Sequence, residues 1–148
     1  MVENLLSEAL RNLISDAVKD FRLPSKEGDI KAPKIVDGFL PLKRGNNDDD
    51  FPFVLVRIEG GKTEQESTNV EVSVIVGCYA ETFDGHAYCL NVMSRIRNAL
   101  MNLPGWILDN KYVLSFPIEY NVIPDQPYPY WQLDITTHWE VKTPPVVF

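Results

Sequence analysis

Two stretches of the chain repeat apolar residues every three or four positions, the spacing of one helical face. The first covers residues 5–21 and ends before Pro24, because the residue that precedes a proline resists helical geometry. The second follows Asp84, a residue type suited to a helix N-cap, and ends at Pro104-Gly105. Polar residues fill the other face of both stretches, so each predicts an amphipathic helix that lays one side against a core.

Elsewhere, apolar and polar residues alternate one by one, which is the pattern of a strand with one buried face. The alternation is longest in residues 69–78 and 130–141, and shorter runs cover residues 51–59 and 112–120. Gly60-Gly61 and the polar stretch after them predict a turn between the first two runs in chain order. These runs are therefore expected to pair as an antiparallel hairpin.

The stretch between the first helix and the first of these strands mixes weak strand signals with a polar segment. Lys34-Ile35-Val36 and Phe39-Leu40 each fit a short strand. Residues 45–50 include no apolar residue and end in three consecutive aspartates. We expect that acidic segment to be an exposed, mobile loop, because it has nothing to bury.

The order of the predicted elements is helix, strands, helix, strands. The 148 residues match the length of one domain, and 45% of them are apolar, enough for a sizeable core. Both helices have one apolar face and the clearest strands alternate, so two layers are the economical arrangement. We therefore expect one α+β domain over residues 1–148, with a mostly antiparallel sheet and two helices packed on one face.

The charge and the cysteine content argue against several classes of partner and indicate a compartment. The chain has 14 basic and 21 acidic residues, a net charge of −7, and its basic residues are scattered. A surface that binds DNA or RNA needs clustered Lys and Arg, so direct nucleic-acid binding is not expected. No run of about 18 apolar residues occurs, which argues against a spanning helix and a membrane partner. The two cysteines, Cys78 and Cys89, cannot form a disulfide framework and fit a reducing cytoplasm.

Gly61-Lys62-Thr63 resembles the end of a phosphate-binding loop. The full pattern needs an earlier glycine where this chain has Val56, and it needs a helix directly afterwards. A polar turn and a strand are expected there instead. The hairpin interpretation is therefore favoured, and no nucleotide cofactor is predicted.

His86 and Cys89 stand three residues apart on the second predicted helix. A thiolate–imidazole pair at that spacing would be a nucleophile. Small buried cysteines are ordinary in protein cores, however, and a polar residue is normal in the first turn of a helix. We favour the structural interpretation and predict no catalytic residue here.

His138 shares the polar side of the last predicted strand with Asp134 and Glu140. Residues four apart on a strand lie roughly 13 Å from each other, too far to share one ion. Only a residue from another strand, such as Glu119, could complete a metal site. The sequence therefore predicts no metal, no cofactor and no catalytic site, and it points away from an enzyme.

Four aromatic residues gather near the end of the chain. Base-stacking surfaces normally lie in a basic groove, and this neighbourhood is acidic and rich in proline. We expect Trp131 and Trp139 to pack under a helix. Tyr128 and Tyr130, which stand beside prolines, are expected to be exposed for a protein partner, because tyrosine is enriched at interfaces.

The layout of elements resembles that of the tail terminator, or tail-completion, proteins of long-tailed phages. The segments that carry the resemblance are residues 53–57, 70–77, 92–100 and 131–141, the last ending in Trp139-Glu140-Val141. The resemblance covers most of the chain. It implies a two-layer α+β fold and a structural protein of a phage or prophage, without catalysis or cofactor.

Proteins of that family form a hexameric ring that sits on the end of the tail tube, stops its growth and offers a surface to the head side. The resemblance thus implies three partners: further copies of the chain, the major tail tube protein and the head-side connector protein. It implies a location in the virion tail after assembly in the host cytoplasm. The candidate contact residues are Asp48, Asp49, Asp50, Tyr128 and Tyr130.

Two other functions stay open at this stage. Residues 25–50 have no clear place in the layout, so the chain could be another phage component, such as a neck or head-closure protein. A small-molecule-binding α+β domain or a small enzyme, with a pocket near His138 or Cys89, is the second alternative.

Overall fold

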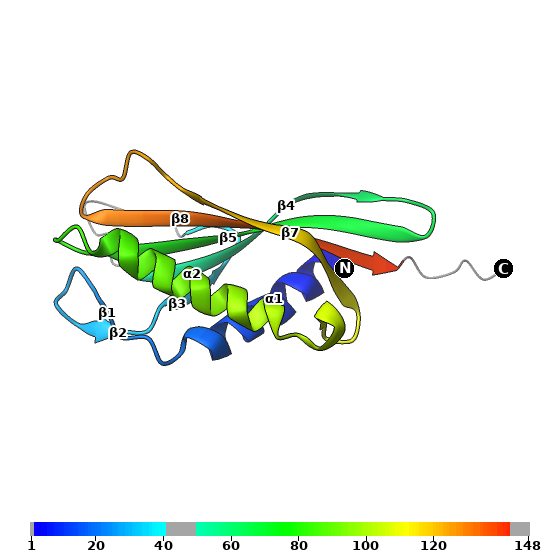
Figure 1. Cartoon of the computed structure of the whole chain (residues 1–148), viewed down its shortest axis with the longest axis horizontal. Helices are drawn as coiled ribbons and strands as arrows, with labels where there is room; N and C mark the ends of the chain where they lie inside the picture. Colours follow the sequence, from blue (N-terminus) through cyan, green and yellow to red (C-terminus); the bar gives the residue numbers. More distant parts are fainter. Residues whose placement is uncertain (1, 41–49, 143–148) are drawn as a thin grey trace.

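The computed structural model describes residues 2–40 and 50–142, and they form two long helices and a curled mixed sheet (Figure 1). Helix α1 spans Val2–Val18 and helix α2 spans Gly85–Met101. The six strands of the main sheet have the order β3-β4-β5-β8-β7-β6. Only β3 and β4 are parallel, and every other neighbouring pair is antiparallel. The predicted α+β class and mostly antiparallel sheet are confirmed.

The other elements of the described residues are the strands and one short 3-10 helix. Strands β1 and β2 form a separate two-stranded sheet, and the 3-10 helix η1 follows α2. In chain order these elements are β1 (Leu23–Pro24), β2 (Ile30–Lys31), β3 (Lys34–Asp37), β4 (Phe53–Thr63), β5 (Ser67–Tyr79), η1 (Pro104–Trp106), β6 (Ile107–Leu108), β7 (Tyr112–Val122) and β8 (Tyr130–Lys142).

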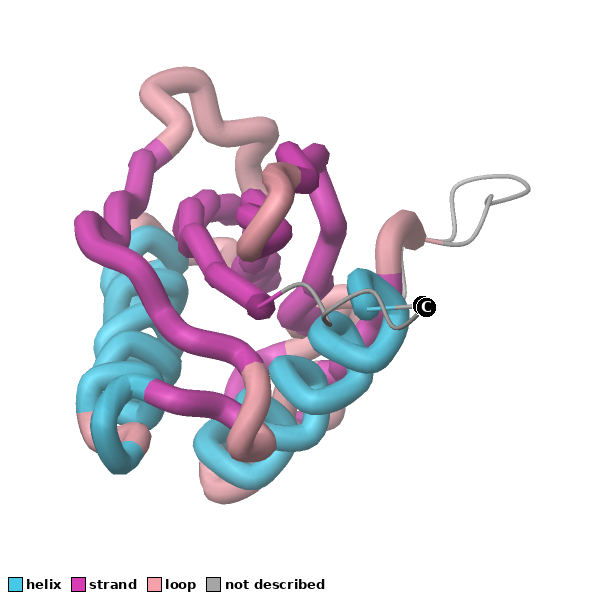
Figure 2. The backbone as a smooth tube through the Cα atoms, turned by 90° about the vertical axis from the view of Figure 1, so that its right-hand side faces the viewer, coloured by secondary structure: helices cyan, strands magenta, loops and turns pink. Residues whose placement is uncertain are grey.

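One hydrophobic core joins both helices to the sheet. Helix α1 packs against β3 and β4, helix α2 packs against β5 and β8, and the two helices contact each other. Figure 2 shows the sheet curled rather than flat. The buried side chains of the helices are Leu6, Leu10, Ile14 and Val18 of α1 and Cys89, Val92, Met93, Ile96 and Leu100 of α2.

The alternation in the sequence explains how the two central strands meet this core. In β5, Val70, Val72, Val74 and Val76 are buried, and in β8 the buried residues are the odd-numbered ones from Trp131 to Trp139. Burying a Val or Leu side chain stabilises a fold by about 1.5–3 kcal/mol, so these two rows are a major source of stability.

Neither helix of the described residues is long and apolar enough to span a membrane.

The first four residues of strand β4, Phe53 to Val56, are buried on both faces of the sheet. Val54 and Val56 belong to the core under the helices, whereas Phe53 and Leu55 belong to a second cluster with Phe51 and Tyr79. Strand segments that are covered on both sides read as continuous apolar runs, and residues 53–56 do. The predicted antiparallel hairpin of β4 and β5 is confirmed.

The sequence predicted that Gly60-Gly61 begins the turn of that hairpin. In the structure both glycines lie within β4 instead. Strand β4 continues to Thr63, with a register shift between Ile58 and Gly60. A Cβ on Gly61 would stand 2.6 Å from the carbonyl oxygen of Asn69, so the backbones approach too closely for a side chain. The glycines therefore serve an irregular strand pair, and the turn comes after them.

Lys34-Ile35-Val36 lies in β3 as expected, but Phe39-Leu40 forms no strand. Gly38 has a φ of +78°, a left-handed conformation that turns the chain away from the sheet. Phe39 is exposed and lies under the guanidinium of Arg57, 4.2 Å from its ring centroid. Strand β3 therefore ends at Asp37, and the second short strand predicted at Phe39-Leu40 does not form.

Candidate functional site

An exposed aromatic patch lies at the start of α2. We call Phe83, Tyr128 and Trp131 the first patch. Phe83 is 80% exposed, and its ring centroid lies 6.4 Å from that of Tyr128 and 6.3 Å from that of Trp131. Tyr128 is exposed too, as expected, whereas Trp131 is buried beneath them.

Hydrogen bonds and close packing hold the first patch in place. The hydroxyl of Tyr128 donates to the carbonyl of Glu81 at 2.6 Å, and the indole N–H of Trp131 donates to the carbonyl of Ala80 at 3.0 Å. A Cβ on Gly85, the first residue of α2, would overlap the Trp131 indole ring. The tryptophan thus packs under the helix, as predicted, and presents the two exposed rings on a rigid base.

A second exposed patch lies beyond the other end of α2. We call Trp106, Ile107 and Phe116 the second patch, and the rings of Trp106 and Phe116 pack edge to face at 4.7 Å. Phe83 precedes α2 and Trp106 follows it. Helix α2 has 17 residues and is therefore about 25 Å long, and the two patches lie at its opposite ends. No local pattern in the sequence indicates this pairing, because Trp106 and Phe116 meet only across the turn that joins β6 to β7.

Tyr130 is only half-buried and does not belong to either patch. Its ring lies 4.8 Å from that of Phe51 and 5.7 Å from that of Tyr79, against the second core cluster. The hydroxyl of Tyr79 donates to the carboxylate of Glu81 at 2.6 Å. That hydrogen bond, with burial, raises the pKa of Tyr79 to about 12. Tyr130, which was expected to be exposed, therefore packs in part against the second core cluster.

The three acidic residues that the sequence suggested as contact residues divide into two groups. Asp48 and Asp49, with the rest of the predicted mobile segment before residue 50, lie outside the described residues. Asp50 was expected to be exposed, and that expectation is wrong: the residue is only 4% exposed. Its carboxylate pairs with the ammonium of Lys34 at 3.2 Å, which compensates for part of the cost of burying the charge.

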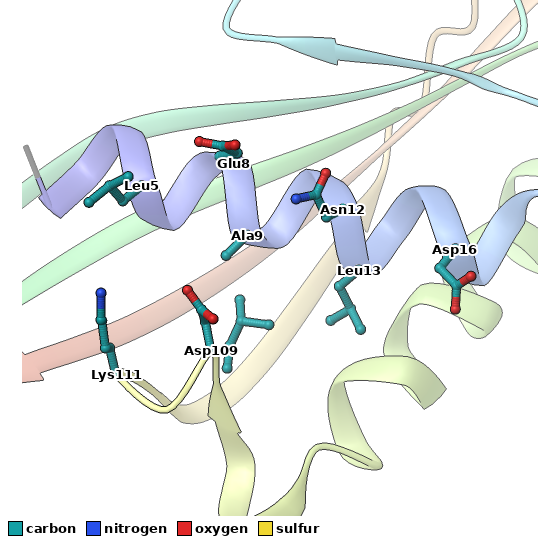
Figure 3. A pocket seen from close by; sticks show the side chains of 9 residues that line it. Leu5, Glu8, Ala9, Asn12, Leu13, Asp16, Asp109 and Lys111 are labelled. Carbon is teal, nitrogen blue, oxygen red and sulfur yellow. The ribbon is translucent and has the colours of Figure 1, made fainter.

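A groove of about 510 Å³ separates α1 from the turn that joins β6 to β7 (Figure 3). Asp109 and Asn110 form that turn with φ values of 53° and 59°, as tight hairpin turns require. The groove combines an apolar floor with charged groups at its rim, an arrangement that fits an apolar side chain flanked by a basic one. Its lining residues are Leu5, Glu8, Ala9, Asn12, Leu13, Asp16, Leu108, Asp109 and Lys111.

The structure separates His86 from Cys89. His86 is exposed, and its Nδ1 lies 2.7 Å from the carbonyl oxygen of Phe83. Cys89 is buried, and its thiol donates to the carbonyl of Trp131 at 3.4 Å. A hydrogen bond with Cys89 and then burial raise the pKa of Cys78, so this thiol stays protonated. The geometry supports a core role for both cysteines.

His138 stands in a row across three strands, with Glu71 of β5 on one side and Ser115 of β7 on the other. The row lies in a shallow groove of about 330 Å³. A nucleophilic serine needs a hydrogen-bonded base, but no hydrogen bond links these three described side chains. Glu119 lies opposite Thr136 rather than His138. Within residues 2–40 and 50–142, no group of three or more His, Cys, Asp or Glu residues could hold a metal ion.

No family model matches the chain, and a comparison with curated proteins gives no match.

Proposed function

We propose that this protein is a tail terminator of a long-tailed phage or prophage, a structural protein that caps the tail tube and joins it to the head side. The observation that carries the proposal is the pair of exposed aromatic patches at opposite ends of α2. Clustered exposed apolar side chains mark protein–protein contact sites. A closed head-to-tail ring uses two different patches on each subunit, and these two patches meet that requirement.

The resemblance in element layout supports the same function, and it supplies the partners. They are further copies of the chain in a hexameric ring, the major tail tube protein and the head-side connector. The net charge of −7 suits a ring through which DNA passes, because such a ring should not hold phosphates. The proposal includes no cofactor and no catalytic step.

The test is made with the tube present. Purified protein is added to growing tail tubes, and tube lengths and tube ends are examined by electron microscopy. We expect short tubes that carry a terminal ring. Phe83→Ala and Trp106→Ala each remove one patch, and each should reduce the fraction of capped tubes, because truncating an exposed aromatic anchor weakens an interface.

Ile30→Ala is the matched control, because Ile30 is an exposed apolar residue outside both patches. This variant should cap tubes as well as the unaltered protein. Tubes that continue to grow with no protein at their ends would contradict the proposal. Capping that is unaffected by both patch variants would contradict the role of the patches.

A further inference from the structure

One side of strand β7 is an open sheet edge. Its neighbour on one side is β8, and β6 covers the other side only at Tyr112 and Val113. In the part of the chain that the structure describes, residues 119–122 pair with β8 alone, and Ile118 directly precedes them at the end of an irregular stretch of β7. An open edge of this kind presents backbone donors and acceptors that another strand can use.

The contacts of Gln132 show which backbone groups of β7 point outward. The Gln132 N–H donates to Oε1 of Gln126 at 2.7 Å, and its carbonyl accepts from Nε2 of Gln126 at 3.0 Å. Gln126 lies on the loop between β7 and β8, so even-numbered residues of β8 turn their backbone groups toward β7. Pro129, an odd-numbered residue, gives its carbonyl to Ala80 at the end of β5.

The pairing register of β7 and β8 then determines which backbone N–H and C=O groups of β7 point toward β8. Asp134 and Thr136 lie opposite Asn121 and Glu119, so Asn121 and Glu119 hydrogen-bond inward to β8. Because backbone direction alternates along a strand, Ile118, Tyr120 and Val122 turn their N–H and C=O groups outward. These groups are the ones that a further strand would meet.

The same three residues form an apolar row, in which Ile118 packs against the core and the other two residues are exposed. Tyr120 and Val122 lie opposite Ile135 and Leu133 of β8, so their side chains share the core face of the sheet. Helix α2 packs over β5 and β8 and does not extend over this part of β7. As a result, Tyr120 is 47% exposed and Val122 is 46% exposed.

We infer that a second copy of this chain pairs with the β7 edge in antiparallel orientation, about a two-fold axis at Tyr120. In that register Tyr120 meets the partner's Tyr120, and Ile118 meets the partner's Val122. Every outward backbone group of the three residues then has a partner. The two apolar rows join on one face of a continuous sheet.

Charge disfavours the neighbouring register, with the axis at Glu119. With the axis at Tyr120, Glu119 stands opposite the partner's Asn121. With the axis at Glu119, the two Glu119 carboxylates would face each other, and like charges directly opposite are destabilising. The inference does not rest on the proposed function, because it concerns the free chain in solution.

The first experiment is cross-linking by a single new cysteine. Directly opposite residues of a hydrogen-bonded antiparallel pair have Cα atoms about 5.5 Å apart, which a disulfide can span. Tyr120→Cys should therefore give a covalent dimer on mild oxidation. Val113→Cys is the matched control, since Val113 is exposed on the same strand but is paired on both sides, and it should stay monomeric. The native Cys78 and Cys89 are buried.

The second experiment measures association by sedimentation equilibrium. Tyr120→Pro removes an outward N–H without removing a bond to β8, and proline is tolerated at such edge positions. It should weaken dimer formation about tenfold or more, while Tyr120→Phe should dimerise like the unaltered chain. Circular dichroism checks that both variants fold.

Each possible result of these experiments either supports or contradicts the inference. A dimer that Tyr120→Pro weakens and Tyr120→Cys traps supports the inference. A chain that stays monomeric at every concentration, a dimer indifferent to Tyr120→Pro, or a Tyr120→Cys variant that does not cross-link would overturn it. A larger assembly that Tyr120→Pro disrupts would also overturn it, because a two-fold pair closes at two copies.

Discussion

Asp134 is a carboxyl group whose surroundings disfavour its charge. It lies on β8 between Ile75 of β5 and Asn121 of β7. Burial raises its pKa above the ordinary value of 3.8, Arg57 opposes this shift, and Glu59 adds to it. Because the folded state holds this proton more tightly than the unfolded chain does, the free energy of unfolding falls as pH rises through that range.

Asp134→Asn should therefore stabilise the protein at neutral pH. Asparagine is uncharged at every pH, so the substitution removes the cost of the ionised carboxylate. The expected result is a higher melting temperature at pH 7 and no gain below pH 3.8, the ordinary value for an aspartate, measured by circular dichroism. Asp125→Asn, at an exposed position on the β7–β8 loop, is the control and should change little. A gain that persists in acid would disprove the explanation.

At the scale of elements, the start of α2 is fixed by its contact with β8. Asp84 occupies the N-cap position as predicted, but its side chain makes no capping hydrogen bond. The helix instead lays Gly85 directly on the Trp131 ring of β8. Packing between elements, rather than local capping, therefore determines where this helix sits on the sheet.

Gly85→Ala tests that contact. The added methyl group has no space beside the indole ring, and overpacking of a core typically costs about 1–3 kcal/mol. Urea denaturation should show this loss in the free energy of unfolding. Gly60→Ala is the control, because no atom lies within 4 Å of the place where its Cβ would stand. If the two variants were equally stable, the proposed role of the Gly85 contact would be incorrect.

At the scale of the whole molecule, the exposed apolar side chains are separate from the two buried cysteines and from His138, whereas His86 borders the first patch. The two aromatic patches lie at opposite ends of α2, whereas the two cysteines are in the core and His138 lies on the sheet. A structural protein needs the patches and not the titratable groups. That separation can be tested directly.

His138→Ala and Cys89→Ala should both leave tube capping intact. Cys89→Ala should lose about 1 kcal/mol of stability, the usual cost of a point substitution, because it removes buried sulfur from the core. The measurements are urea denaturation and the capped fraction seen by electron microscopy. Loss of capping by a well-folded His138→Ala protein, together with metal found in the unaltered protein, would overturn the structural interpretation.

The sequence alone determined the long elements and, for the helices and the two central strands, their buried faces. Local periodicity was sufficient for both helices and the four long strands, since a residue's face follows from its spacing to its neighbours. The alternation of β8 correctly placed Trp131 and Trp139 inside and His138 on the opposite face. Tyr128 and Tyr130 were expected to be exposed because they stand beside prolines, and only Tyr128 is exposed.

Only the tertiary structure decided which strands are neighbours and which faces remain uncovered. It placed β8 between β5 and β7, and so left one side of β7 open. It buried Asp50 beside Lys34, which is sixteen residues away in the chain. It also joined Phe83 to Tyr128, and Trp106 to Phe116. These contacts link residues distant in sequence, and no local pattern of apolar and polar positions encodes such a contact.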